Sequence, residues 1–376
     1  MEINILNKCR DFNTYRAARV KSLFNPERGN TFELTDTLDI DDGNWQIGLI
    51  VGQSGTGKTS MGRVIFGEDK ICDLYGGWDS EKPIVDCIDP TGDFNTVTGS
   101  LAAVGLGDVP AWLRPFSALS NGQRFRAGLA RLICEQPAEV VVDEFTSVVD
   151  RQIAKVGALA FSKTWKRLKG KRAVLLSCHY DITDWLQPDW VYDTTEHRFE
   201  RGLLRERPKI ELQIWKTSSS YWKMFKQHYY LDLPMPVAAS YFVGTVQGEP
   251  VCHVAVCPKF ESRGYRATRL VVMPEWQGAG VGTRFLESVC QWHKAGNGLG
   301  SKKFGTFFHT SHPQLIQFMR RSPNWILKSQ VLYGGDKRKS GQSIIRTTSA
   351  KEKITSGGYG GHFRAVQGFK YIGVAA

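Results

Sequence analysis

The feature that most constrains the fold of this chain is a glycine-rich run directly after a short apolar segment. Residues 46–51 are typical of a β-strand, and the next eight fit G-x-x-x-x-G-K-[ST] at every position: Gly52, Gln53, Ser54, Gly55, Thr56, Gly57, Lys58 and Thr59. In a strand–loop–helix setting, backbone N–H groups turn toward a polyphosphate, Lys58 reaches the β- and γ-phosphates, and the Thr59 hydroxyl coordinates Mg²⁺. The run predicts a nucleoside triphosphate site on an α/β fold.

Charge is divided unevenly along the 376 residues, a length that fits two domains. Residues 1–205 carry 25 Lys and Arg against 28 Asp and Glu, whereas residues 206–376 carry 24 against 9, a net charge of +15. Such a basic half favours nucleic acid as a partner, with a merely basic surface as the alternative. The run Lys337, Arg338 and Lys339 fits either a solvated loop or a clamp on a phosphate backbone.

Compartment and metal binding are constrained by what the sequence lacks. The eight cysteines form no C-x-x-C pair, and Cys252 and Cys257 would point to opposite faces of a predicted strand, so we interpret them as reduced thiols. The amino terminus lacks a signal peptide's apolar stretch, and no run approaches 18 apolar residues. We therefore expect a cytoplasmic protein with no membrane-spanning segment.

Four further motifs follow the glycine-rich run in one order. Residues 119–123 read Leu-Ser-Asn-Gly-Gln at the start of a helical pattern, and the strand 140–142 ends in Asp143 and Glu144. Residues 147–150 follow at once, and a strand over 173–178 leads to His179. Together these runs resemble the Walker A, signature, Walker B, D-loop and H-switch motifs of the ABC-type ATPases over about residues 20–205.

The chemistry of these positions suits ATP hydrolysis. Asp143 offers Mg²⁺ an oxygen ligand beside Thr59. Glu144 can polarise the attacking water, and His179 can contact the γ-phosphate. In the family the signature completes the site of the opposite subunit, so the resemblance implies an ATP-dependent homodimer in which phosphate meets Ser120, Gly122 and Gln123.

The sequence departs from the ABC pattern in the segment between Lys58 and Ser120. No Gln occurs there, so the Q-loop glutamine is missing, and either Asp86 or Asp89 is a candidate replacement. The aromatic residue that would stack on adenine is not identified either, and Phe24 and Phe32 are the two candidates. The segment is also short for the subdomain that contacts a membrane partner in transporters, which favours the soluble ABC ATPases that act on nucleic acid.

A second strand–glycine loop–helix pattern lies beyond a predicted linker near residue 206. The strand 269–273 leads to the glycine loop, and a helix is predicted over 283–294. The loop suits a pyrophosphate but lacks the Lys-Ser/Thr of a triphosphate site. It resembles the acetyl-CoA motif of the GNAT acyltransferases, which implies acyl-CoA binding by Gln277, Gly278, Ala279, Gly280, Val281 and Gly282. It also implies a splayed strand whose backbone, at Leu270, Val271 and Val272, pairs with the pantetheine arm.

Other elements of this half are predicted from periodicity. Strands are expected at 210–216, 239–247, 251–258, 304–308 and 369–373, and helices at 219–230 and 314–321. The residue that donates a proton to the CoA thiolate is left open. GNAT enzymes often use a Tyr, but none occurs between Tyr265 and Tyr333. His309, Ser311 or His312 could serve, and Glu275 could relay a proton from the acceptor amine; Ser311 could instead cap a helix.

We therefore expect an α/β fold class: a P-loop ABC-type ATPase domain over residues 1–205, followed by an α+β GNAT domain with a mixed, splayed sheet over 206–376. The combination resembles fusions found in bacteriophages and their nucleic-acid-modifying systems. It implies an ATP-dependent acyltransferase that uses acetyl-CoA or another acyl-CoA on a nucleobase of DNA or RNA. Two alternatives remain: an ATP-regulated N-acetyltransferase of protein or small-molecule amines, and a DNA-binding ABC ATPase with a non-catalytic GNAT domain.

Overall fold

The chain divides into two compact units that do not follow sequence order. The computed structural model describes residues 2–8, 10–24, 31–40, 43–202, 205–231, 235–236, 238–259, 263–331 and 366–373. Unit 1 comprises Met1–Gly76, Glu135–Ala158 and Ser162–Arg207, and unit 2 comprises Gly77–Cys134, Leu159–Phe161 and Pro208–Ala376. The glycine-rich run thus lies in unit 1, while the signature segment belongs to unit 2 together with the basic half.

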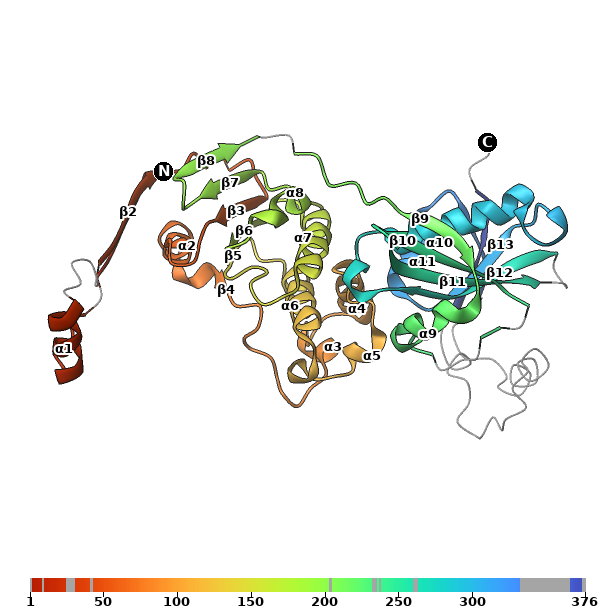
Figure 1. Cartoon of the computed structure of the whole chain (residues 1–376), viewed down its shortest axis with the longest axis horizontal. Coiled ribbons are helices and arrows are strands. Elements are labelled where there is room, and N and C mark those ends of the chain that lie inside the picture. The colour runs from red at the N-terminus through yellow and green to blue at the C-terminus, as the bar shows by residue number, and fades with distance from the viewer. Residues whose placement is uncertain are drawn as a thin grey trace. The chain divides into compact units, whose positions relative to one another are not determined.

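Unit 1 is built on a six-stranded sheet in the order β4-β5-β6-β3-β7-β8, shown in Figure 1. Its strands are β3 (Ile47–Val51), β4 (Ile71–Cys72), β5 (Glu139–Val142), β6 (Arg172–Ser177), β7 (Trp190–Asp193) and β8 (Arg198–Arg201). All pairs are parallel except β7–β8. All five β3 residues are buried, as expected for a central parallel strand. The phosphate loop therefore starts at the carboxyl end of the sheet's centre.

Helices and a hairpin complete unit 1. The helices are α1 (Tyr15–Phe24), α2 (Lys58–Phe66), η1 (Glu68–Lys70), η3 (Tyr180–Ile182), α8 (Thr183–Leu186) and the greater part of α7 (Arg151–Trp165). Strands β1 (Glu2–Lys8) and β2 (Thr31–Thr37) pair antiparallel. Ile3, Ile5 and Leu34 from this hairpin share a buried core with Trp45 and Trp190. Apolar packing thus ties the hairpin to the central sheet.

Unit 2 contains a helical segment that lies, in sequence, between strands β4 and β5 of unit 1. It consists of α3 (Ile84–Cys87), α4 (Phe94–Ala103), α5 (Val109–Trp112), η2 (Phe116–Ala118) and α6 (Asn121–Glu135), whose last residue is assigned to unit 1. The Asp93 carboxylate caps α4 by accepting from the Asn95 and Thr96 N–H groups. Helix α4 packs beside α11 (Pro313–Arg321) (Figure 1). The helical segment therefore packs against the part of unit 2 that follows Pro208.

The rest of unit 2 is a seven-stranded sheet in the order β14-β15-β13-β12-β11-β10-β9. Its strands are β9 (Gln213–Thr217), β10 (Ser240–Val246), β11 (Glu249–Lys259), β12 (Gly264–Val272), β13 (Thr306–Thr310), β14 (Trp325–Val331) and β15 (Val366–Tyr371). Only β12 and β13 pair parallel, and they do so only where Tyr265, Arg266 and Ala267 face 306–308. Beyond Ala267 the two strands diverge, and a bulge in β12 places Arg269 at φ 56°. The sheet is mixed and splayed at this point.

Short helices surround the sheet: η4 (Ser219–Tyr221), α9 (Trp222–Phe225), η5 (Lys226–His228), η6 (Pro274–Trp276), α10 (Val281–Trp292), η7 (His293–Asn297) and η8 (Leu299–Ser301). Helix α10 packs on one face, where Glu287 Oε1 accepts from Trp325 Nε1 at 2.9 Å. The helix predicted over 219–230 is present over 219–228, where η4, α9 and η5 follow one another without a gap and bury Trp222 and Phe225; it ends two residues early because Tyr229 is extended. In the described part of the chain, no helix has the length and apolar character needed to span a bilayer.

Candidate nucleotide site and glycine loop

The glycine-rich run of unit 1 lines a cavity of about 410 Å³. The sequence-predicted residues that meet there are Ser54, Gly55, Gly57, Lys58, Thr59, Asp143 and Glu144, joined by Ser60, Ser147, Leu176 and Cys178. They come from the loop after β3, the first turn of α2 and the ends of β5 and β6. Because parallel strands end at one sheet edge, segments 85 residues apart in sequence form one cavity.

Lys58 and Thr59 are held as a phosphate and Mg²⁺ site requires. The Lys58 ammonium donates to the backbone oxygens of Gly52 at 2.8 Å and Gln53 at 2.6 Å, so it lies over the loop. Burial lowers the pKa of Lys58, while the nearby Cys178 and Asp143 oppose this shift. The Thr59 hydroxyl donates to Asp143 Oδ1 at 3.2 Å. The two predicted Mg²⁺ ligands are therefore in contact.

Metal binding at this point would depend on the nucleotide. Among the described residues, no three His, Cys, Asp or Glu side chains group closely enough to hold a metal ion. Thr59 and Asp143 supply one hydroxyl and one carboxylate, so phosphate oxygens and water would complete an octahedral Mg²⁺ site. Glu144 follows at φ 48°, and its N–H donates to Asp143 Oδ1 at 2.9 Å. This bond fixes the backbone of the predicted hydrolytic carboxylate next to the metal ligand.

Two threonines that the motifs did not indicate brace the loop. The Thr56 and Thr194 hydroxyls lie 2.5 Å apart, and Thr195 Oγ1 accepts from Gln53 N–H at 3.1 Å. A Cβ on Gly52 would lie 2.1 Å from Thr194 Oγ1, so only glycine fits at this position. Thr194 and Thr195 follow β7, which pairs with β3. Their position next to the run becomes visible only once the sheet order is known.

His179 follows β6 but does not line the cavity, whereas its neighbour Cys178 does. The His179 N–H donates to Ser177 Oγ at 3.1 Å. Burial lowers the pKa of His179, Arg151 adds to this effect, and Asp181 opposes it. A lowered pKa keeps the imidazole neutral near pH 7, the form that can donate one hydrogen bond and accept another.

The remaining ABC-type candidates lie in unit 2 or outside the described side chains. Ser120 precedes α6, where its N–H donates to Gln123 Oε1 at 3.0 Å, and Gln123 Nε2 donates to Asp108 Oδ2 at 3.1 Å. Gly122 lies in the first turn of α6. The Asp89 carboxylate accepts from Thr91 in a local turn. The side chains of Phe24 and Phe32 and the whole run of Lys337, Arg338 and Lys339 lie outside the described residues.

The second glycine loop joins β12 to α10 in unit 2. Gly278 and Gly280 adopt φ of 94° and 81°, and Gly280 caps α10, which begins at Val281. A Cβ on Gly282 would lie 2.6 Å from the Val272 side chain, so the first turn of α10 approaches the end of β12 closely. The loop therefore directs the positive end of a 12-residue helix toward the space where β12 and β13 diverge.

The helical segment of unit 2 packs on this loop through backbone atoms. Gln277 Oε1 accepts from Gly107 N–H at 3.1 Å, and Gln277 Nε2 donates to Val272 O at 2.9 Å. A Cβ on Gly105, which has φ 85°, would lie only 2.1 Å from Gln277 O. The side chain of Gln277, predicted as part of the ligand site, is thus committed to protein partners.

Arg126, the fourth residue after Gly122, strengthens the same contact. Its Nη1 donates to Gly105 O at 3.1 Å and Pro274 O at 2.6 Å. Its Nε and Nη2 are buried with no hydrogen-bond partner among the described residues. Burial lowers the pKa of Arg126 to about 10, against the attraction of Glu275. Arg126, in the helix that follows the signature run, thus hydrogen-bonds both the helical segment and the residues before the glycine loop.

The candidate proton-transfer residues lie at the end of β13. Burial lowers the pKa of His309 to about 4, helped by Arg266 and Lys259, and burial lowers the pKa of His312 to about 4 as well. Both imidazoles are therefore neutral at pH 7 and are poor donors to a thiolate. His309 Nδ1, His312 Nδ1 and Ser311 Oγ are buried with no hydrogen-bond partner among the described residues. Ser311 makes no cap: His312 occupies the N-cap position of α11.

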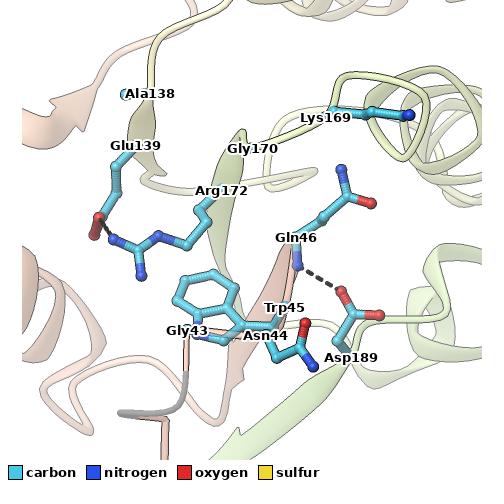
Figure 2. A pocket seen from close by; sticks show the side chains of 10 residues that line it. All are labelled: Gly43, Asn44, Trp45, Gln46, Ala138, Glu139, Lys169, Gly170, Arg172 and Asp189. Atoms are coloured by element: carbon cyan, nitrogen blue, oxygen red, sulfur yellow. Dashed lines mark hydrogen bonds and ion pairs between the residues drawn. The ribbon is translucent and has the colours of Figure 1, made fainter.

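Unit 1 also has a larger cavity, of about 620 Å³, at the opposite, amino-terminal ends of its strands. Figure 2 shows the Trp45 indole beside Arg172, whose guanidinium also pairs with Glu139 at 2.6 Å. Asp189 accepts from the Gln46 and Ile47 N–H groups. Glu139, Arg172 and Asp189 of this cavity have partners within the protein, and no motif residue lines it.

Comparisons with known proteins return ATP-binding cassettes among solved structures. No protein-family model and no curated protein matches the chain. A dimeric post-hydrolysis cassette with ADP and Pi is 14% identical, with a TM-score of 0.37, over 52% of this chain and 98% of that one. A bacterial ABC transporter cassette is 14% identical at TM-score 0.35 over the same shares. An Atm1-family exporter with ATP bound is 14% identical at 0.33, over 45% of this chain and 35% of that one. At these values the functional interpretation rests on the geometry above.

Proposed function

We propose that this chain is an ATP-dependent acyltransferase that modifies nucleic acid. Unit 1 would hydrolyse ATP, and unit 2 would transfer an acyl group from acyl-CoA to a nucleobase. The observation that carries the ATPase part is the single cavity that joins the phosphate loop with Thr59, Asp143 and Glu144.

Each of these residues has a defined part in hydrolysis. Lys58 and the loop N–H groups hold the β- and γ-phosphates. Thr59 and Asp143 would hold Mg²⁺, and the ion would supply positive charge to the phosphate oxygens. Glu144 orients a water for in-line attack on the γ-phosphorus, and ADP leaves as the P–O bond breaks. Ser120 and Gly122 would complete the site of a second copy, which supports an ATP-dependent homodimer.

Support for acyl transfer comes from the topology of unit 2. A mixed sheet with one parallel pair, a splay after Ala267 and a glycine loop at the start of α10 match what a GNAT-type site needs. The loop N–H groups would hold the pyrophosphate, and the backbone of 270–272, which does not pair with β13, would pair with the pantetheine arm. In the transfer a C–N bond forms at the acceptor amine as the thioester C–S bond breaks, and the amine proton leaves as the thiolate gains one.

One experiment tests the whole proposal. The protein is incubated with ATP, labelled acetyl-CoA and either DNA or RNA, and the nucleic acid is digested to nucleosides for mass spectrometry. We expect a labelled nucleoside only when all three are present, and none with the Lys58→Ala variant. Label on the protein or on an added polyamine alone would favour the amine acetyltransferase.

A non-catalytic second unit is the other candidate, and a specific observation favours it. The two imidazoles at the end of β13 have pKa values near 4, and no Tyr lies between Tyr265 and Tyr333. In that case unit 2 would bind CoA without turnover while ATP hydrolysis responds to DNA. Calorimetric CoA binding with no labelled product from any acceptor would establish this function.

A further inference from the structure

One face of the unit 2 sheet carries an aromatic ring between cations. Arg266, Phe307 and Lys370 are direct cross-strand neighbours on β12, β13 and β15, so their side chains share a face. Lys259 Nζ lies 4.6 Å from the centre of the Phe307 ring and Lys370 Nζ lies 5.6 Å from it. Helix α10 packs on the opposite face, where Tyr371 hydrogen-bonds Gln291. Helix α9 packs on the same side of the sheet, where Trp222 and Phe225 contact His253 of β11. We call the surface formed by Lys259, Arg266, Phe307 and Lys370 the Phe307 face.

Glycines let the rings of this face lie down on the sheet. A Cβ on Gly264 would lie 2.9 Å from Phe307 Cε2, so the phenyl ring rests directly over that glycine. A Cβ on Gly368 would likewise lie 2.9 Å from the His309 ring, two residues further along the same face. Any other residue at these two positions would displace the rings. Both rings therefore lie close against the backbone of the sheet.

In the part of the chain that the structure describes, the strands of this face carry almost no negative charge. Strands β12 to β15, as described, contain no Asp or Glu, and the only carboxylate of β11 is Glu249 at its far end. Arg266 has exposed surface, although partial burial of its guanidinium lowers its pKa, and Phe307, His309 and Lys370 are partly exposed. Burial lowers the pKa of His309, and the nearby charges of Arg266 and Lys259 add to this effect. Among the described residues of these strands, no carboxylate therefore lies beside the cations around the ring.

We propose that the Phe307 face binds a single-stranded segment of nucleic acid, with one base stacked on Phe307 and the flanking phosphates held by Lys259, Arg266 and Lys370. Flat aromatic rings between cations are what unpaired bases and their backbone require. The face leads from Phe307 to His309, next to the point where β12 and β13 diverge. A base bound there would lie beside the proposed acyl site, so the assignment rests on the proposed function and specifies its acceptor.

The test uses the full chain and a fluorescent oligo-dT, with binding followed by anisotropy at several salt concentrations. We expect Lys259→Gln/Lys370→Gln to lower the slope of log K against log salt by about 1.4, from about 0.7 for each lost phosphate contact. Phe307→Leu keeps the apolar bulk but removes the ring, and we expect affinity to fall about tenfold with the slope unchanged. The matched control is Lys169→Gln/Lys171→Gln in unit 1, which removes the same charge and should leave binding unchanged. ATPase turnover without nucleic acid should be wild type in all three.

The outcomes separate this inference from the proposed function. If wild type binds oligo-dT but the Phe307-face variants bind equally well, the face is wrong and the proposed function stands. Equal losses for the face and control variants would mean non-specific charge attraction and would overturn the assignment. Tighter binding to a duplex than to oligo-dT, unaffected by Phe307→Leu, would overturn base stacking. No binding of wild type to any nucleic acid at low salt would overturn both.

Discussion

Placing an alanine at Gly105 tests the contact between the helical segment and the glycine loop of unit 2. Gly105 has φ 85°, and an added Cβ would lie 2.1 Å from Gln277 O and 2.7 Å from Gln277 C. Ordinary contacts begin near 3.4 Å, so the loop backbone would have to move by about 1 Å. Gly280 is the matched control, because its φ is 81° and a Cβ there would meet nothing within 4 Å.

The two variants should differ by the cost of the clash alone. Both place an L-residue in the left-handed region, at about 1–2 kcal/mol. Gly105→Ala also overpacks the contact, which costs about 1–3 kcal/mol more. We therefore expect the free energy of unfolding to drop by about 2–5 kcal/mol for Gly105→Ala and by about 1–2 kcal/mol for Gly280→Ala.

Urea unfolding measures the total effect, and hydrogen exchange of residues 274–282 assigns it to the loop. Exchange there should speed up in Gly105→Ala, because the Gln277 carbonyl and its neighbours are displaced. Equal unfolding free energies for the two variants, with unchanged exchange over 274–282, would refute the packing of the helical segment on the loop.

Three more predictions follow from the sites. Glu144→Gln should keep ATP binding, lose most turnover and trap an ATP-bound dimer; a variant that stays monomeric on size-exclusion chromatography at saturating ATP would exclude the sandwich dimer. Gly280→Glu should abolish CoA binding in calorimetry and leave ATP affinity intact, because the carboxylate repels the pyrophosphate at the loop. The native His312 pKa of about 4 lies below the ordinary 6.5, so the unfolded chain binds more protons between these values. Stability should therefore fall by up to about 3 kcal/mol as the pH drops from 6.5 to 4, and His312→Gln should reduce that loss in urea titrations.

Local patterns in the sequence predicted the elements that hold the sites. The apolar runs 46–51, 140–142 and 173–178 are β3, β5 and β6 to within a residue, because buried parallel strands are apolar on both faces. The glycine loop and the helix after it were equally predictable, since α10 begins at Val281, two residues before the expected start. The apolar runs and the glycine loop could be predicted because neighbouring residues in the sequence determine these backbone conformations.

Elements that depend on distant partners were not predicted. Nothing in the sequence near Thr194 and Thr195 indicates that they brace the phosphate loop, since β7 must first pair with β3. The hairpin β1–β2 and the strand β14 also escaped prediction, and six of the seven β14 residues are exposed. The helical spacing over 219–230 did predict a helical run, which the structure has over 219–228, but not its division into 3-10 and α-helical turns.

Residues 77–134 belong to the same unit as the carboxyl-terminal half, yet their amino-acid composition does not indicate this. The reason is that the contacts between the two segments use backbone atoms. Gly105 packs closely against Gln277 O, the Gly107 N–H donates to Gln277 Oε1, and Arg126 donates to Pro274 O. The contact thus depends on two glycines and three backbone groups. The composition change near residue 206 coincides with the boundary between the two units at Arg207 and Pro208, but nothing in composition marks that residues 77–134 also belong to unit 2. Because Gln123 binds Asp108 next to Gly107, the signature residues and the glycine loop belong to one hydrogen-bonded body. A ligand that displaces the Gln123 side chain would break its hydrogen bond to Asp108, next to the contact between Gly107 and Gln277. Hydrogen bonds therefore link the two proposed sites of unit 2, the signature residues and the glycine loop.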